Sequence, residues 1–114
     1  MSSEPVKTPV QHYPVAADIP CGLRFAQQSP PEGWGRISKI SQDSVELETY
    51  FTLVPEERVF LTFAIEQLHQ FSDVPAKVSG VRSGGHYPRV EILLDDGPHR
   101  ARLKEAMIFL VNRT

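Results

Sequence analysis

Apolar residues recur at a period of two between positions 58 and 66, and this pattern restricts the folds open to the chain. Val59, Leu61, Phe63 and Ile65 occupy every second position of this run. Successive side chains of a β-strand point to opposite faces, so this spacing predicts a strand with one face in a core. Shorter alternating stretches precede and follow it, separated by clusters of proline, glycine and aspartate. Strands punctuated by such turns are typical of an antiparallel β domain.

The same pattern predicts five further strands, and a helix follows them. The expected strands are residues 22–27, 34–41, 44–50, 74–82 and 86–94, and the glycines at 84 and 85 favour a hairpin between the last two. Residues 98 to about 112 repeat apolar side chains at helical spacing, with one stripe formed by Leu103, Ala106, Met107, Leu110 and Val111. The expected fold class is therefore all-β with a terminal helix. We expect an antiparallel β-barrel of about six strands with a C-terminal α-helix packed across it.

The first twenty residues differ in composition from the rest. They contain prolines at positions 5, 9, 14 and 20, each of which removes a backbone donor and disfavours helix. We expect residues 1–20 to form a flexible N-terminal tail and residues 21–114 to form the folded domain. An alternative is that Tyr13 and Val15 dock as an edge strand.

Composition limits the functional classes. A chain of 114 residues suits one domain, and twelve Lys and Arg against fourteen Asp and Glu give a net charge of −2. No overall positive field therefore favours nucleic acid or anionic lipid. The single cysteine, Cys21, has no partner for an internal disulfide, and no apolar run has the length of a signal or membrane span. We expect a cytoplasmic protein with no membrane insertion.

The sequence offers weak candidates for chemistry. Glu46 and Glu48 share one strand face, but nothing in the sequence desolvates them, so we expect a solvated face and not an acid/base pair. The histidines lack metal-ligand spacing; they are His12, His69, His86 and His99. We therefore expect no catalytic residues, no metal and no cofactor, and the chain is predicted not to be an enzyme.

The stretch from Gly35 to Asn112 resembles a PilZ domain in the order and spacing of its parts. These parts are GRISKISQDSVELET, ERVFLTFAI, PAKVSGV, RVEILLDD and HRARLKEAMIFLVN. The resemblance implies a six-stranded barrel that ends in a helix, in a bacterial signalling protein.

The resemblance also implies two motifs for binding cyclic di-GMP, and this chain departs from both. In the family, D/NxSxxG lies at the turn between two strands; here Ser41 matches, Lys39 replaces the acidic or amide residue, and Ser44 replaces the glycine. An RxxxR motif precedes the first barrel strand, but residues 1–23 contain no arginine. Two guanidinium forks bind a dianion with a bidentate geometry that lysine cannot supply. Arg24 and Arg36, with Lys39, offer a substitute cationic cluster, although simple alternation places Arg36 and Lys39 on opposite strand faces.

These departures favour a stand-alone, degenerate PilZ-like domain that acts as a non-enzymatic signalling adaptor. The resemblance implies protein partners in type IV pilus assembly, motility or cyclic di-GMP signalling. Ile108 and Phe109 lie outside the core stripe of the helix, which predicts that they belong to the partner surface. One alternative is a cyclic di-GMP receptor that uses Arg24, Arg36, Lys39, Ser41 and Ser44. A second alternative is a small RNA-binding β-barrel, which the acidic balance and the absence of an aromatic and basic stripe disfavour.

Overall fold

The computed structural model describes residues 15–26, 32–82 and 87–113. Within these residues the chain forms six β-strands and one α-helix. The elements are β1 (Val15–Phe25), β2 (Glu32–Ile40), β3 (Ser44–Thr49), β4 (Arg58–Ile65), β5 (His69–Arg82), β6 (Arg89–Leu94) and α1 (Pro98–Arg113). The expected fold class, an antiparallel barrel of six strands with one C-terminal helix, is confirmed.

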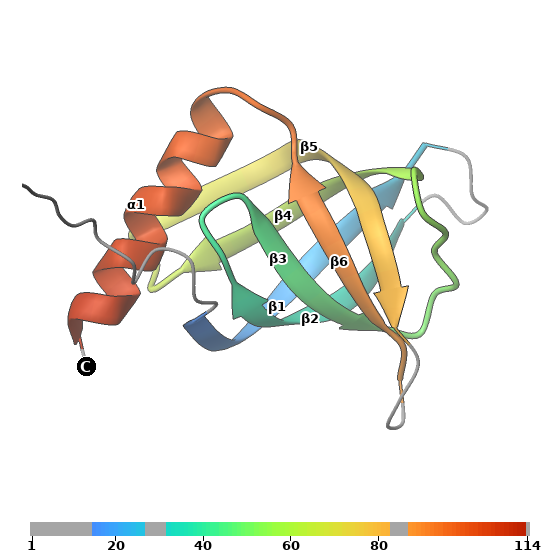
Figure 1. The fold of residues 1–114 in the computed structure, drawn as a ribbon, viewed down its shortest axis with the longest axis horizontal. Helices are drawn as coiled ribbons and strands as arrows, with labels where there is room; N and C mark the ends of the chain where they lie inside the picture. Colours follow the sequence, from blue (N-terminus) through green and yellow to red (C-terminus); the bar gives the residue numbers. More distant parts are fainter. Residues whose placement is uncertain (1–14, 27–31, 83–86, 114) are drawn as a thin grey trace, which may run out of the picture.

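The strands close into a barrel in the order β1-β2-β3-β6-β5-β4, and every neighbouring pair is antiparallel. The pairing of β1 with β4 completes the closure. Figure 1 shows α1 standing across one end of the barrel, beside β5 and β1. No helix among the described residues is long and apolar enough to span a membrane.

The alternating run that dominates the sequence fills the barrel interior. Val59, Leu61 and Ile65 of β4 are fully buried, and the ring of Phe63 stacks on that of Phe71 with the ring centroids 4.6 Å apart. The helix closes this core with a shorter stripe than expected. Its fully buried residues are Leu103, Ala106 and Met107, whereas Leu110 and Val111 are half-buried.

The predicted tail of residues 1–20 is wrong for its last six residues, because β1 begins at Val15. Residues 15–20 pair with β2 only, whereas the pairing with β4 starts at Gly22. Where a strand has a neighbour on one side only, the backbone N–H groups on its other side take no part in strand pairing. Proline, which has no N–H, is therefore tolerated at position 20. Tyr13 lies outside the described residues.

The limits of two later strands also differ from expectation. β5 begins at His69 and not at residue 74, although it contains Pro75 and a positive φ of 53° at Asp73. Proline and a positive φ both disfavour regular strand pairing, so the sequence pattern did not predict a strand before residue 74. β6 begins at Arg89 and pairs antiparallel with β5, which confirms the expected hairpin, while its turn at 83–86 lies outside the described residues.

A β-bulge in β2 overturns the expected separation of Arg36 and Lys39. The pairing of β2 with β3 shifts register between Ile37 and Lys39. The extra residue places Ile37 and Ile40 in the core, both fully buried, and leaves Arg36 and Lys39 both exposed on the outer face. Side chains normally alternate between the two faces of a strand. The bulge inserts one extra residue, so the residues after it face the side opposite to the one that alternation predicts.

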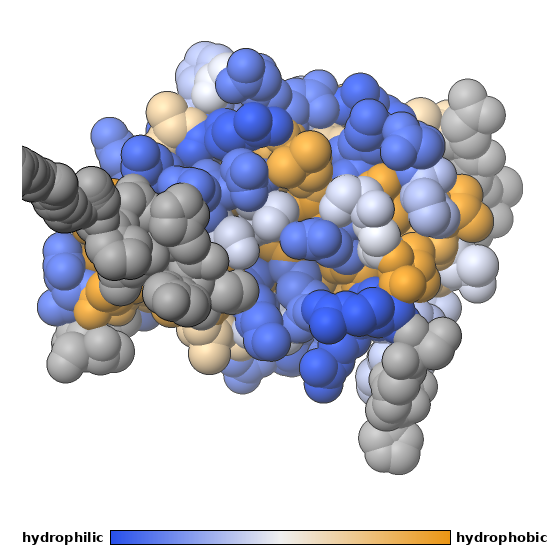
Figure 2. All heavy atoms as spheres, viewed as in Figure 1, coloured by the Kyte–Doolittle hydropathy of each residue, from blue (hydrophilic) through white to orange (hydrophobic). Residues whose placement is uncertain are grey.

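The face of the molecule drawn in Figure 2 is mostly polar. Figure 2 shows hydrophilic side chains over most of one face of the barrel, with hydrophobic groups gathered toward the end away from α1 and near the C-terminal end of α1. Within the part of the chain that the structure describes, the exposed large hydrophobic residues are Trp34, Tyr50, Val54, Leu68, Val81, Tyr87 and Ile108.

Candidate functional site

The three motif positions at the β2–β3 turn lie together around a small hollow. The backbone N–H of Ser41 donates to the carbonyl oxygen of Ser44 at 2.8 Å, which closes the turn. The hollow has a volume of about 90 Å³ and is lined by Lys39, Ser41, Ser44, Glu46, Arg82 and Glu91. We call it the turn hollow.

Glu46 lies in the turn hollow, and the expectation that it belongs to a solvated face is wrong. The residue is 7% exposed. One carboxylate oxygen accepts a hydrogen bond from the Ser38 hydroxyl at 3.0 Å, and the other lies 2.6 Å from a guanidinium nitrogen of Arg82. Ser38 stands at the bulge of β2, and Arg82 reaches over from the end of β5. Both contacts depend on strand pairing, so the local sequence did not reveal them.

The charges of the turn hollow balance. Lys39 and Arg82 contribute two cations, and Glu46 and Glu91, which are opposite one another on β3 and β6, contribute two carboxylates. A dianionic ligand gains little from a neutral site, and a carboxylate at contact distance repels it.

Arg24 does not join the motif positions. It pairs across β1–β2 with Glu32, whereas Lys39 pairs with Ala16 near the other end of the same ladder. Its guanidinium donates two hydrogen bonds to Asp73, at 2.9 and 2.7 Å, and lies 4.1 Å from the ring centroid of Phe60. The hydrogen bond with Arg24 lowers the pKa of Asp73, and the same bond raises the pKa of Arg24. Arg24 is therefore a fixed partner of Asp73.

Arg36 also lies outside the turn hollow. It forms an ion pair with Asp18 on β1 and stands opposite Glu48 in the β2–β3 ladder. Glu48 is half-buried and pairs with Arg89 at 3.3 Å. Of the five residues expected to bind a ligand, Lys39, Ser41 and Ser44 gather, while Arg24 and Arg36 do not.

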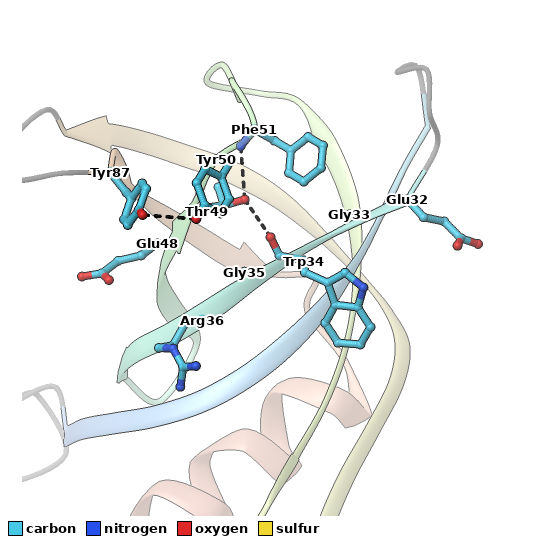
Figure 3. Close-up of a pocket in the computed structure, with 10 residues that line it drawn as sticks. All are labelled: Glu32, Gly33, Trp34, Gly35, Arg36, Glu48, Thr49, Tyr50, Phe51 and Tyr87. Carbon is cyan, nitrogen blue, oxygen red and sulfur yellow. Dashed lines mark hydrogen bonds between the residues drawn. The ribbon is translucent and has the colours of Figure 1, made fainter.

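A larger hollow, which the sequence analysis missed, lies on the outer face beside Arg36 (Figure 3). Its volume is about 570 Å³. We call it the aromatic hollow; its lining residues are Glu32, Gly33, Trp34, Gly35, Arg36, Glu48, Thr49, Tyr50, Phe51 and Tyr87. The exposed fractions of Trp34 and Tyr50 are 70% and 78%.

Three strands bring the aromatic side chains together. Trp34 belongs to β2, Tyr50 follows β3, and Tyr87 precedes β6. The rings of Tyr50 and Tyr87 meet edge to face with centroids 4.7 Å apart, and their hydroxyl oxygens are 3.2 Å apart. The hydrogen bond with Tyr50 raises the pKa of Tyr87. The outward position of Trp34 follows from alternation along β2, but the approach of Tyr87 depends on the pairing of β3 with β6.

Glycines on both sides of Trp34 allow the close packing beneath it. A Cβ at Gly33 would lie 2.3 Å from the Phe51 ring, and one at Gly35 would lie 2.9 Å from the carbonyl oxygen of Glu48. Phe51 packs in turn against Phe25, with ring centroids 5.2 Å apart. The floor of the aromatic hollow therefore requires glycine at position 33.

The two predicted partner-binding residues differ in exposure. Ile108 is 41% exposed, whereas Phe109 is half-buried and its ring lies 5.6 Å from that of His69. The helix thus presents Ile108 to solvent, with Phe109 only partly available.

Two observations concern metal-binding and nucleophilic side chains among the described residues. No group of three or more His, Cys, Asp or Glu within residues 15–26, 32–82 and 87–113 is placed to hold a metal ion. Cys21 is fully buried, and this burial raises the pKa of its thiol to about 12, so the thiolate is scarce at neutral pH.

Comparison with solved structures identifies the fold. The PilZ domain of YcgR from Escherichia coli, solved with c-di-GMP, has a TM-score of 0.71 at 14% identity, with 93% of each chain covered. The Bacillus subtilis inhibitor of motility, MotI/DgrA, has a TM-score of 0.71 at 11% identity over 94% of this chain and 52% of that chain. The PilZ domain of CeSA from a cellulose-synthesizing bacterium has a TM-score of 0.60 at 13% identity, covering 89% and 97%.

Sequence comparison adds no relative, because no protein-family model and no curated protein matches the chain. The chain nevertheless has the fold of a PilZ domain, as the resemblance in the sequence implied. It spans about half the length of MotI/DgrA.

Proposed function

We propose that this chain is a PilZ-fold signalling adaptor that works through protein contacts, without catalysis and without binding cyclic di-GMP at micromolar concentration. The observation that carries the proposal is the Glu46 carboxylate in the turn hollow, hydrogen bonded to Ser38 and paired with Arg82. A ligand phosphate placed there would meet a carboxylate, and it would have to compete with Glu46 for the guanidinium of Arg82.

The motif departures support the same proposal. Lys39 and Ser44 stand where the family has an acidic or amide residue and a glycine, and no arginine precedes Arg24. Arg24 holds Asp73 at the other end of the β1–β2 ladder, so it cannot replace a missing guanidinium fork without losing that pair. The alternative receptor function would need the turn hollow to rearrange.

Ligand-linked melting tests the ligand part of the proposal. A ligand at about 100 times its dissociation constant stabilises a protein by about 2.7 kcal/mol. For a domain of this size, that corresponds to a rise in melting temperature of about 10 °C or more. We expect no rise with 1 mM cyclic di-GMP, while the PilZ domain of YcgR serves as the positive control. A rise of that size would contradict the proposal and favour the receptor.

The adaptor role and the partner surface are tested together. If Ile108 and Phe109 anchor a protein partner, Phe109→Ala should weaken the complex by about 2 kcal/mol, which is roughly 30-fold in affinity. A matched control is Val54→Ala, which removes an exposed apolar side chain from the loop between β3 and β4. The partner is first captured from the source bacterium with the wild-type chain and identified. Equal affinity of wild type, Phe109→Ala and Ile108→Ser for that partner would contradict the assignment of this surface.

A further inference from the structure

Three aromatic side chains of the aromatic hollow form one row across neighbouring strands. The β2–β3 ladder ends with the pair Gly35 and Thr49, so the next residues, Trp34 and Tyr50, follow side by side. The Thr49 hydroxyl donates to the carbonyl oxygen of Trp34 at 3.0 Å, which holds the two strands together at this end. On the other side of Tyr50, the ring of Tyr87 meets it edge to face at 4.7 Å. Figure 3 shows Tyr50 between Tyr87 and Trp34, and all three side chains are exposed. We call them the aromatic row.

The length of the aromatic row matches the repeat of a polyproline II (PPII) helix. Neighbouring strands lie about 4.8 Å apart, so Trp34 and Tyr87, one strand away from Tyr50 on either side, are separated by about 10 Å of sheet. A PPII helix rises about 3.1 Å per residue and repeats every three residues, which gives about 9 Å per turn. Two residues three positions apart in such a helix therefore reach the two ends of the aromatic row.

The barrel geometry argues against two other modes of peptide binding. β2 pairs with β1 and β3, and β3 pairs with β2 and β6, so a peptide cannot extend the sheet here. An α-helix with its side chains is about 10 Å wide. Arg36 and Glu48 lie opposite one another two positions along from Trp34 and Tyr50, which is about 7 Å away. A helix would therefore cover charged side chains as well, whereas one extended segment fits the aromatic row alone.

A glycine beside the aromatic row leaves the ring of Trp34 accessible. Gly22 pairs with Trp34 across β1 and β2, and a Cβ there would lie 3.9 Å from the indole. Because glycine has no side chain, the indole stands above the surface of β1, and Trp34 is 70% exposed. Grooves lined by exposed aromatic rings bind proline-rich segments, whose PPII conformation is formed before binding and costs little entropy to hold.

Two ion pairs beside the aromatic row are electrically neutral. Arg36 pairs with Asp18 on β1, and Glu48 pairs with Arg89 on β6 at 3.3 Å. Figure 3 shows Arg36 and Glu48 on the side of the aromatic hollow away from Phe51. A polyanion would therefore find no excess of positive charge at this side.

The end of the aromatic hollow near Trp34 carries an excess of negative charge. Glu32 lines the hollow and lies two residues before Trp34 on β2. It stands opposite Arg24, whose guanidinium donates two hydrogen bonds to Asp73. One cation between two carboxylates leaves one negative charge, so a basic side chain of the occupant is favoured here.

We propose that the aromatic hollow binds a proline-rich segment of a partner protein in PPII conformation, with a basic residue of that segment beside Glu32. Prolines three positions apart pack on Trp34 and on the ring pair of Tyr50 and Tyr87. This inference rests on the proposed adaptor function, because it adds a second surface for a protein partner. It involves neither the turn hollow nor the helix surface of Ile108.

Trp34 reports binding, because it is the single tryptophan of the chain. A synthetic peptide of nine prolines with an arginine at each end is titrated into the full-length chain, and the emission of Trp34 is recorded. We expect a saturable shift to shorter wavelength with a dissociation constant below about 300 μM. A peptide with serine and glycine in place of the prolines keeps the charge but is flexible, and it should bind about tenfold more weakly. No saturable shift, or equal affinity for the two peptides, would overturn the proposal.

Variants of Tyr50 test whether the peptide lies in the aromatic hollow. Tyr50→Ala removes the central ring of the aromatic row and should weaken binding about tenfold or more, whereas Tyr50→Phe keeps the ring and should bind like wild type. Leu68→Ala is the matched control, because Leu68 is 67% exposed in the turn between β4 and β5. Thermal melting checks that Tyr50→Ala is folded, and Tyr87→Ala takes its place if it is not. Wild-type affinity in the folded alanine variant would overturn the assignment of the site.

The charge of the peptide tests the role of Glu32. The proline peptide with a glutamate at each end should bind about fivefold more weakly than the arginine peptide, as expected for an exposed ion pair. Glu32→Gln should remove most of this difference, whereas Glu105→Gln, which removes an exposed charge from α1, should keep it. Equal affinity of the wild type for the two peptides would overturn the proposed basic residue. Because these titrations use neither cyclic di-GMP nor a partner bound at the helix, their failure is distinct from failure of the proposed function.

Discussion

The carboxylate of Glu46 and the guanidinium of Arg82 lie 2.6 Å apart across the outer face of β3, β6 and β5, with Glu46 7% exposed and Arg82 74% exposed. The buried carboxylate of Glu46 is thus paired with a guanidinium that is largely exposed to solvent. Without Arg82, the hydrogen bond that remains to the Glu46 carboxylate among the described residues is the one from the Ser38 hydroxyl. This ion pair joins two of the charged residues that line the turn hollow.

Arg82→Ala should lower the free energy of unfolding by about 1–2 kcal/mol, because a hydrogen bond to a charged group is lost and the carboxylate stays buried. Arg89→Ala is the matched control, since its longer contact with the more exposed Glu48 is a surface pair worth about 1 kcal/mol or less. Urea unfolding measures both. A loss for Arg89→Ala equal to that for Arg82→Ala would show that the burial of Glu46 has no energetic consequence.

Two leucines test the core. Leu61 of β4 is fully buried and Leu68 is 67% exposed in the turn that follows. Leu61→Ala should cost about 2–5 kcal/mol through lost burial and a residual cavity. Leu68→Ala should cost less than about 0.5 kcal/mol. Similar losses in chemical unfolding would mean that the alternating strand does not line the barrel interior.

Gly33→Ala tests the close packing beneath Trp34. The new methyl group would lie 2.3 Å from the Phe51 ring, so the ring must move, and overpacking of this kind costs about 1–3 kcal/mol. Gly80→Ala adds the same group to β5 where no heavy atom lies within 4 Å. Thermal melting of the two variants should show a loss only for Gly33→Ala, and an unchanged melting temperature there would contradict the packing of Phe51.

The contact between Tyr50 and Tyr87 gives a prediction for alkaline pH. The hydrogen bond holds the neutral hydroxyl of Tyr87, so its pKa is raised in the folded protein. The resulting stabilisation is fully present below the ordinary tyrosine pKa of about 10 and is lost as the pH rises through the raised value. Absorbance titration follows Tyr87 alone in Tyr13→Phe with Tyr50→Phe, since the chain has three tyrosines. The single variant Tyr13→Phe should give two pKa values, one for each remaining tyrosine. The pKa of Tyr87 in the double variant should be lower than the higher of these two, and a pKa equal to that higher value would contradict the hydrogen bond.

The sequence predicted the parts of the fold that depend on local periodicity. The alternation from Val59 to Ile65 identified a core strand, and the spacing of Leu103, Ala106 and Met107 identified the buried face of the helix. Both patterns result from side-chain geometry within one element, which is why they can be recognised without neighbours.

The sequence could not predict features that depend on pairing between elements. The bulge at Ile37–Lys39 changed which side chains of β2 face outward, and the burial of Glu46 required Arg82 from a strand 36 residues away. Pro20 concealed the start of β1, because whether a strand tolerates proline depends on whether it has one neighbour or two. The aromatic hollow was missed for the same reason, since Tyr87 approaches Tyr50 across the ladder of β3 and β6.

Isothermal titration with cyclic di-GMP decides whether this chain is an adaptor or a receptor. With the PilZ domain of YcgR as positive control, we expect no saturable heat for this chain at micromolar ligand, because the charges of the turn hollow balance and Glu46 pairs with Arg82. A saturable isotherm with a dissociation constant below about 10 μM, a binding free energy of roughly −7 kcal/mol, would contradict the adaptor function and make the chain a cyclic di-GMP receptor.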